Sequence, residues 1–335
     1  MLRQTCLACV AMAVMAMTAV AAGGDRKTAF NDPAQAGPDF QVQGEYVGEC
    51  QDKDAKAACG VQVVALGDGK FQAVGYQGGL PGAGWDKKEK MHAEGQTADG
   101  VTTLAAKDGS HTATIKDGAM TIKNKDGAIT GTLKKVLRKS PTQGAKPPAD
   151  AVVLFDGTSA EKFDGGRLSP DGLLMEGDTS KQKFQSFTVH LEFRTPFQPN
   201  ARGQGRGNSG FYAQGRYEVQ ILDSFGLEGV DDECGGIYKV GRPAVNMCLP
   251  PLSWQTYDVD FTAAEFKDGK KVKNARMTVR HNGVEIHKDI EIPFATTAAP
   301  VREGPEPGPI YLQNHGNPVR FRNIWLLDTR GKSDR

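Results

Sequence analysis

Short segments in which apolar and polar residues alternate, separated by turn residues, constrain the fold of this chain more than any other feature. In Phe187–Arg194 (FTVHLEFR) every second residue is apolar, which predicts a strand with Arg194 on its solvated face. Asn282-Gly283 forms a two-residue hairpin turn between two further alternating segments. Because 41 glycines and 18 prolines lie among 335 residues with few helical patterns, we predict an all-β chain built mainly as a β-sandwich.

The first residues are typical of a secretory signal peptide. Arg3 precedes an uncharged apolar run over residues 7–20, which ends in small residues around Ala21 and Ala22. This run is too short to span a bilayer comfortably, so residues 1–22 are predicted to be cleaved. We therefore expect an exported protein, periplasmic or secreted, that has no membrane association after cleavage.

Four cysteines remain after residue 22, an even number that suits an oxidising compartment. Their local spacing favours disulfides between Cys50 and Cys59 and between Cys234 and Cys248, although the sequence alone permits three pairings. A zinc site from the same residues is disfavoured because no C-x-x-C or H-E-x-x-H spacing is present.

The charge pattern excludes strongly charged partners. The chain has 41 basic and 40 acidic residues, a net charge of +1, spread along its length. We therefore expect no nucleic-acid or anionic-membrane partner. A small neutral ligand agrees better with this even distribution of charge. The sequence carries no signal for an oligomeric state.

Composition shifts divide the chain into segments. After the signal, residues 23–40 resemble a flexible lead-in, and residues 140–150 (SPTQGAKPPAD) form a proline-rich linker. Between them, residues 41–139 contain nine-residue repeats that begin at Lys107, Lys116 and Lys125, each starting Lys-Asp-Gly, which predicts a small antiparallel β meander with tight turns. A calcium-binding nonapeptide solenoid is disfavoured because its glycine pattern is absent. Residues 151–330 form the second domain.

Two strands of the second domain are predicted to form a polar groove. Residues 217–224 (YEVQILDS) place Glu218 and Gln220 on one face, and the segment from Gly308 (GPIYLQNHG) places Gln313 and His315 on one face. Amide, carboxylate and imidazole groups together suit a sugar ligand. His315 is followed by a glycine, which permits close approach of a ligand.

No metal or other cofactor is expected. Glu228, Asp231, Asp232 and Glu233 crowd before Cys234 and offer oxygen ligands for a divalent cation such as calcium. The spacing of a known calcium loop is absent, so a solvated acidic surface is the favoured interpretation.

Several separated motifs in the second domain occur together in a known family. They are residues 155–157 (FDG), 208–210 (NSG), 217–223 (YEVQILD), 234–238 (CGGIY), Trp254 with residues 257–258 (YD), 308–316 (GPIYLQNHG) and 321–324 (FRNI). On these motifs, residues 152–328 resemble the 3-keto-disaccharide hydrolase domain family, which belongs to the concanavalin-like jelly rolls. Phe163 and residues 253–255 (SWQ) depart from its usual pattern. The first domain lies outside the resemblance.

The resemblance implies cleavage of glycosides that are already oxidised at sugar C3. The ketone acidifies the C2 proton, so one base removes it, the C1 oxygen leaves by elimination, and water is added afterwards. The implied base is His315 or Glu218, and Arg194, Lys239 and Tyr238 are candidate donors to the enolate oxygen. The candidate residues that contact the substrate are Asn208, Gln220, Gln313 and Trp254. The rival hypotheses are a non-catalytic carbohydrate-binding module of the same fold and an extracellular adhesion protein.

Overall fold

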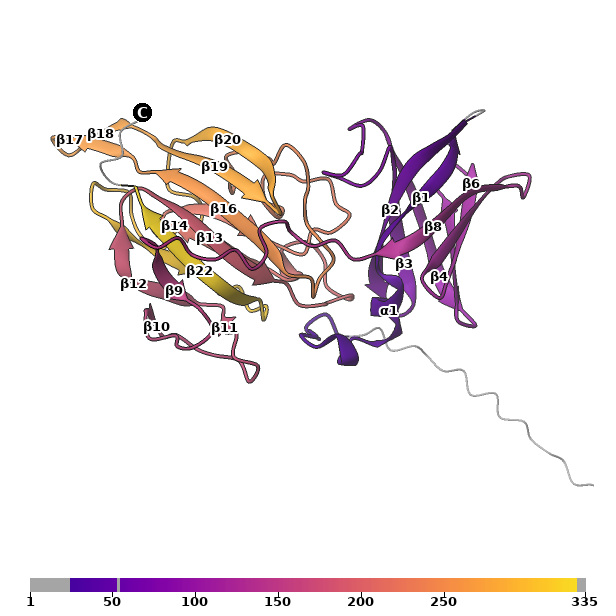
Figure 1. Ribbon diagram of the computed structural model, residues 1–335, viewed down its shortest axis with the longest axis horizontal. Helices are drawn as coiled ribbons and strands as arrows, with labels where there is room; N and C mark the ends of the chain where they lie inside the picture. The colour runs from indigo at the N-terminus through magenta and orange to yellow at the C-terminus, as the bar shows by residue number, and fades with distance from the viewer. Residues whose placement is uncertain (1–24, 53–54, 330–335) are drawn as a thin grey trace, which may run out of the picture.

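A computed structural model describes residues 25–52 and 55–329, and it shows two all-β bodies, a closed barrel followed by a two-sheet sandwich (Figure 1). The predicted all-β fold class is confirmed. The predicted signal peptide lies outside the described residues. Across 25–52 and 55–329, no helix has the length and apolar character needed to cross a membrane.

The N-terminal body is an eight-stranded barrel in which consecutive strands pair antiparallel and the last strand pairs with the first. A 3-10 turn η1 (Pro33–Gln35) and a short helix α1 (Gly37–Val42) precede it. Its strands are β1 (Gly44–Asp52), β2 (Ala55–Gly67), β3 (Lys70–Gln77), β4 (Lys90–Ala98), β5 (Val101–Ala106), β6 (His111–Lys116), β7 (Ala119–Asn124) and β8 (Ile129–Val136).

The lysine-aspartate-glycine repeats form tight turns in this barrel, as predicted. Asp117 and Gly118 join β6 to β7 with φ angles of 49° and 74°. Two successive positive φ angles match the right-handed twist of the flanking strands, and glycine adopts them without a steric penalty. The repeat therefore encodes consecutive hairpins, and closure of the meander into a barrel leaves no free edge strand.

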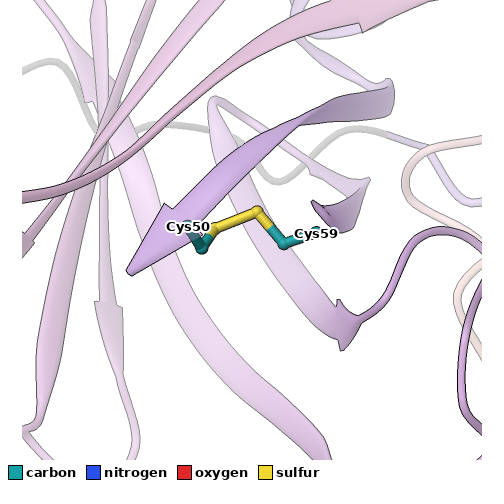
Figure 2. The surroundings of a disulfide bond; sticks show 2 residues. All are labelled: Cys50 and Cys59. Carbon is teal, nitrogen blue, oxygen red and sulfur yellow. A yellow bond between two sulfur atoms is a disulfide. The ribbon is translucent and has the colours of Figure 1, made fainter. Parts of the chain in front are cut away.

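Cys50 and Cys59 form a disulfide between β1 and β2, as the spacing predicts (Figure 2). Their Cα atoms lie 5.8 Å apart, and Cys59 pairs in register with Gly48. The bond therefore links the two neighbouring strands β1 and β2 covalently.

Replacing Cys50 and Cys59 together with alanine is expected to lower the free energy of unfolding by about 2–3 kcal/mol, because the bond closes a loop of sequence separation 9 in the unfolded chain. Equilibrium urea unfolding measures this change. A double variant as stable as the wild-type protein would show that the strand pairing alone holds this hairpin.

The predicted disulfide between Cys234 and Cys248 is wrong, because both residues are free thiols in the buried core. The Cys234 thiol lies 3.3 Å from the Tyr257 hydroxyl, and the Cys248 thiol donates to the Leu222 carbonyl at 3.5 Å. The two thiols also hydrogen-bond to each other, so the spacing places them side by side without making them a disulfide. Local spacing could not reveal the Tyr257 and Leu222 partners, since they come from other segments.

The second body is a sandwich of a five-stranded and a seven-stranded antiparallel sheet. The five-stranded sheet has the order β10 (Phe163–Asp164), β12 (Asp178–Phe184), β21 (Gly308–Leu312), β14 (Ser209–Ala213) and β15 (Tyr217–Ile221). The seven-stranded sheet has the order β11 (Leu174–Met175), β22 (Arg320–Asp328), β13 (Phe187–Arg194), β16 (Gln255–Thr262), β19 (Ala275–His281) and β20 (Val284–Ile292), with β9 (Val152–Phe155) also on β22. A small hairpin of β17 (Glu265–Lys267) and β18 (Lys270–Lys273) and a 3-10 turn η2 (Gly203–Gly205) complete the body.

Alternation along the strands builds the sandwich core. Phe187, Val189, Leu191 and Phe193 of β13 all lie in the main apolar cluster, as the sequence pattern predicts. Burial of such side chains contributes about 1.5–3 kcal/mol each, so this one strand is a large part of what holds the two sheets together. The predicted hairpin turn at Asn282-Gly283 also forms, between β19 and β20.

The proline-rich segment after β8 packs against the outer face of the seven-stranded sheet. The Thr142 hydroxyl donates to Asp258 at 2.7 Å, and the Ala145 carbonyl accepts from the Trp325 indole at 3.2 Å. In Figure 1 this segment runs from the barrel across the sandwich. The prolines prevent strand pairing there, and side chains of the sheet hold the segment instead.

Further contacts join the barrel to the sandwich. Phe197 of the sandwich is fully buried and belongs to the apolar cluster of the barrel, where its ring centroid lies 5.4 Å from that of Phe40. Lys90 of β4 forms an ion pair with Glu228 at 2.7 Å. An aromatic side chain of one body thus completes the core of the other.

Candidate active site

The outer face of the five-stranded sheet carries a row of polar and aromatic side chains. Strand register places Glu218 of β15 opposite Tyr212 of β14, and Tyr212 opposite Tyr311 of β21. The next row places Gln220 opposite Gly210, whose carbonyl accepts from the Gln313 backbone at 2.9 Å. Residues between these positions point into the core, so alternation alone generates this surface.

Glu218 has the most unusual environment on this face. Its side chain is buried, with 2% of the residue exposed, and this burial raises the pKa of its carboxyl group to about 8. A hydrogen bond with Tyr212 acts in the opposite direction and lowers the pKa, but its effect is smaller. The carboxyl group therefore exchanges its proton near neutral pH, where a general acid or base works best.

Gly210 makes room for this carboxyl group. A β-carbon at Gly210 would lie 2.2 Å from the Glu218 Oε1 atom, which is far inside van der Waals contact. Any larger residue would push the carboxyl group out of its position. The glycine of the Asn-Ser-Gly motif is thus required by packing against Glu218.

Tyr212 connects Glu218 to two other elements. Its hydroxyl accepts from the Gln313 amide at 3.0 Å and lies 3.1 Å from the Thr297 carbonyl. The backbone N–H of Glu218 donates to the Thr296 hydroxyl at 2.9 Å. Because Tyr212 is itself buried and held by these partners, it fixes the orientation of the carboxyl group.

A second cluster of polar side chains lies beside Glu218 and Tyr212. It consists of the amide side chains of Gln204, Asn208 and Gln220. Gln204 of η2 accepts through Oε1 from Asn208 at 2.9 Å and from Gln220 at 3.2 Å. The Asn208 Oδ1 and Gln220 Oε1 atoms are buried and have no hydrogen-bond partner among the described residues. Two unpaired acceptors side by side are costly in a folded protein, so the site keeps hydrogen-bonding capacity that its own residues do not use.

Tyr238 and Lys239 lie on the loop after β15. The Tyr238 backbone N–H donates to the Glu218 carbonyl at 3.4 Å, which places this loop along the strand that carries Glu218. The Lys239 ammonium group lies 5.5 Å from the centre of the Tyr238 ring and pairs with Asp232 at 2.7 Å. Half of the Lys239 side chain is exposed, so a cation and a phenol stand at the accessible edge of the site.

His315 does not occupy the predicted position on the strand. Strand β21 ends at Leu312, and His315 lies exposed in a turn in which Asn314 Oδ1 accepts from the Gly316 N–H at 2.8 Å. Gly316 has a φ of 79°, which ends the alternation. Gln313 faces Tyr212 as expected, but the rule that puts residues two apart on one face no longer applies at His315.

Arg194 and Trp254 lie at the other sheet, where Trp254 directly precedes β16. Arg194 ends β13 of the seven-stranded sheet and pairs with Asp171 at 3.7 Å rather than with Glu192 or Glu218. The Trp254 ring packs against both Arg194 and Arg322, at 5.1 Å and 4.0 Å from the guanidinium carbons. Because the outer faces of a sandwich point in opposite directions, the structure does not bring these two residues to Glu218.

Three residues of the site were not predicted from the sequence: Tyr212, Tyr311 and Gln204. Tyr212 follows Phe211, which faces the core, so alternation in β14 was a signal that could have found it. Gln204 had no such signal, because it reaches the site from a turn outside the sheet.

The acidic residues before Cys234 have partners of their own. Asp232 pairs with Lys239, and a Glu233 oxygen accepts from the backbone of Gly229 at 2.6 Å. Within the part of the chain that the structure describes, no group of three or more histidine, cysteine, aspartate or glutamate side chains is arranged to hold a metal ion.

Comparison with known proteins identifies the sandwich body. Residues 150–327 match the family model of the 3-keto-alpha-glucoside-1,2-lyase-like domain. A crystal structure of a candidate glycosyl hydrolase from Parabacteroides distasonis ATCC 8503 is 34% identical, over 54% of this chain and 84% of that chain, with a TM-score of 0.49. A second such structure from the same organism is 17% identical, over 58% and 98% of the two chains, with a TM-score of 0.39. No curated protein matches the chain. Since the family model covers more than half of its residues, this chain belongs to the family of the 3-keto-alpha-glucoside-1,2-lyase-like domain.

Proposed function

We propose that this protein cleaves 3-keto-glycosides by elimination, with Glu218 as the base that removes the C2 proton. The observation that carries the proposal is the buried Glu218 carboxyl group, whose pKa is raised to about 8 on a polar sheet face. A carboxylate in that range is basic enough to accept a carbon-bound proton that a neighbouring ketone acidifies. Membership of the family agrees with this substrate class.

The reaction needs one base and donors for an enolate. Glu218 takes the proton from C2, and the electron pair of that C–H bond forms the enolate of the C3 ketone. The enolate then expels the C1 oxygen, which leaves as the alcohol after it gains a proton, and water adds to the resulting double bond. Because no oxocarbenium ion forms, the second carboxylate that ordinary glycosidases need is not required.

The surrounding residues have separate roles in this proposal. Lys239 and Tyr238 at the accessible edge donate to the enolate oxygen, since a cation and a phenol both stabilise developing negative charge. Asn208, Gln220 and Gln313 hold sugar hydroxyl groups, because amides offer both a donor and an acceptor. Tyr212 keeps the carboxyl group of Glu218 in place.

The rate is expected to depend on pH through Glu218. A base must be deprotonated, so kcat/KM should rise about tenfold per pH unit below the raised pKa of about 8 and level off above it. Initial rates between pH 5 and pH 10 measure this profile. A rate that falls steadily with pH over the same range would assign Glu218 the role of an acid instead.

His315→Ala is expected to change kcat/KM by no more than about threefold, because His315 is exposed on a turn beyond β21. The measurement is the rate of sugar release at pH 8. A loss of a hundredfold or more would indicate that His315, and not Glu218, is the base.

Substrate choice separates this enzyme from a binding module of the same fold. The mature protein should release sugar from a 3-keto-disaccharide and leave the unoxidised parent disaccharide intact, since only the ketone acidifies C2. Chromatography of both mixtures over time provides the test. Saturable binding of the keto-sugar without turnover would instead support the non-catalytic carbohydrate-binding module.

We also propose that the chain is exported. The sequence of residues 1–22 and the Cys50–Cys59 disulfide both support an oxidising compartment. Mass spectrometry of the protein from its native host would show an N-terminus near residue 23, whereas a retained Met1 would contradict export by this route.

A further inference from the structure

The barrel has a wall of unusually small side chains. Strand register places Ala73 of β3, Ala93 of β4 and Ala106 of β5 opposite one another in one row. Val61, Gly75 and Met91 form the next row, towards one end of the barrel. Eight-stranded barrels are either filled by their own side chains or hold one small ligand, and methyl groups in adjacent strands leave space for a ligand.

One end of this barrel is closed. Phe71 of β3 is 1% exposed in the apolar cluster, and Phe197 of the sandwich packs into the same cluster. Phe40 of α1 packs against Phe197, so the helix and the neighbouring body together cover this end. These packed aromatic side chains therefore close this end of the barrel.

The other end is open and leads into the wall of alanines. A cavity of about 460 Å³ lies there, and residues from β1, β2, β3, β4, β6, β7 and β8 line it. Below it, a narrower apolar space of about 50 Å³ is lined by Ala73, Ala93 and Leu104. The two share Val61 and Gly75 as lining residues, so they adjoin along the barrel axis. Together they form a cup within the size range of ligand sites.

The mouth of the cup is polar while its floor is not. His111, Lys90 and Asp108 line the mouth, and the buried Thr130 hydroxyl has no hydrogen-bond partner among the described residues. We propose that the barrel binds a compact apolar molecule, of the size of one or two aromatic rings, with its single polar group at this mouth. The proposal is independent of the activity assigned to the sandwich.

A fluorescent apolar amine with two aromatic rings, 1-naphthylamine, tests the proposal with the full-length mature protein. We expect saturable binding to one site with a dissociation constant in the micromolar range, and emission typical of an apolar environment. Absence of saturable binding to the wild-type protein would overturn the proposal.

Two variants that fill the cup test where the dye binds. A β-carbon at Gly75 would lie 3.4 Å from its nearest neighbour beyond the adjacent residues, Met91, which is ordinary contact, and Gly75 lines the cavity that the remaining side chain of Gly75→Leu would fill. Ala93→Phe fills the cup from β4. Each should weaken dye binding at least tenfold, whereas Thr103→Leu on the exposed outer face of β5 should leave it unchanged. Folded filling variants that bind as the wild-type protein does would contradict the proposal.

A crystal of the wild-type protein soaked in 4-bromophenol decides the matter even if both variants fail to fold. The bromine atom gives an anomalous signal that locates the apolar ring directly. We expect the peak in the apolar floor of the cup, against Ala73 and Ala93, with the phenol hydroxyl towards Thr130. A peak only elsewhere, or binding at crystal concentration only with no response in solution, would overturn the proposal.

Discussion

Replacing Glu218 with glutamine is expected to lower kcat/KM for a 3-keto-glycoside by about 10²–10⁴-fold, the usual contribution of a general base. Glutamine keeps the shape and the hydrogen bond of the buried side chain but cannot accept a proton. The rate of sugar release at pH 8 measures the loss. Glu285→Gln, an exposed position on β20 of the other sheet, is the matched control and should keep the wild-type rate.

The same variant is expected to be more stable than the wild-type protein. The pKa of Glu218 is raised to about 8 in the folded state from its ordinary value of 4.5, so between these pH values only the folded chain holds the proton. Folding stability therefore falls as the pH rises from 4.5 to 8. Glutamine removes this cost, which should be on the order of 2–4 kcal/mol at pH 8. Urea unfolding at pH 5 and pH 8 should show the gain only at the higher pH. A variant that is less stable than the wild-type protein at pH 8 would contradict a raised pKa of the buried Glu218 carboxyl group.

Replacing Arg206 with methionine is expected to destabilise the protein by about 3–5 kcal/mol, because it leaves the Asp223 carboxylate buried without its partner. The Arg206 Nε atom lies 2.6 Å from the Asp223 Oδ2 atom, and the two side chains are 5% and 0% exposed. Arg206 also donates to the Ala65 carbonyl of the barrel at 3.1 Å, so its loss removes a contact between the two bodies. Urea unfolding measures the effect.

Arg202 provides a matched control for this variant. It donates to the Leu66 carbonyl of the barrel at 2.7 Å but lies exposed, so Arg202→Met should cost less than about 1 kcal/mol. The double variant Arg206→Met with Asp223→Asn should recover part of the loss, because the uncompensated charge is gone. An Arg206→Met protein within 1 kcal/mol of the wild type would show that the buried pair contributes little.

Much of the fold could be predicted from the sequence because it depends on side-chain alternation and on turn residues, which are both local features of the chain. The alternation of Val189 and Leu191 predicted the buried face of β13, and the Asp117-Gly118 and Asn282-Gly283 turns formed where the sequence placed them. These features depend on side-chain spacing and on backbone conformation at single residues. Neither depends on which distant segment packs against them.

The site could be predicted only in part, because alternation gives the face of a strand and not its sheet. Arg194 points away from the sandwich core as predicted, but that face of β13 is largely buried rather than solvated and belongs to the sheet opposite Glu218. The sequence prediction extended the alternation of β21 as far as His315. The strand ends before this residue, where the Asn314 side chain and Gly316 form a turn. The raised pKa of Glu218 depends on long-range burial that no local pattern encodes.

The most direct test of elimination by Glu218 uses a 3-keto-glycoside that carries deuterium at C2. If removal of the C2 proton limits the reaction, the wild-type protein should cleave this substrate several-fold more slowly than the protiated one, and the product in ordinary water should have lost its deuterium. The Glu218→Gln variant should release sugar and lose the label more slowly than the wild-type protein by the same factor, about 10²–10⁴-fold. Cleavage that retains deuterium at C2 would contradict elimination, whatever residue performs the reaction.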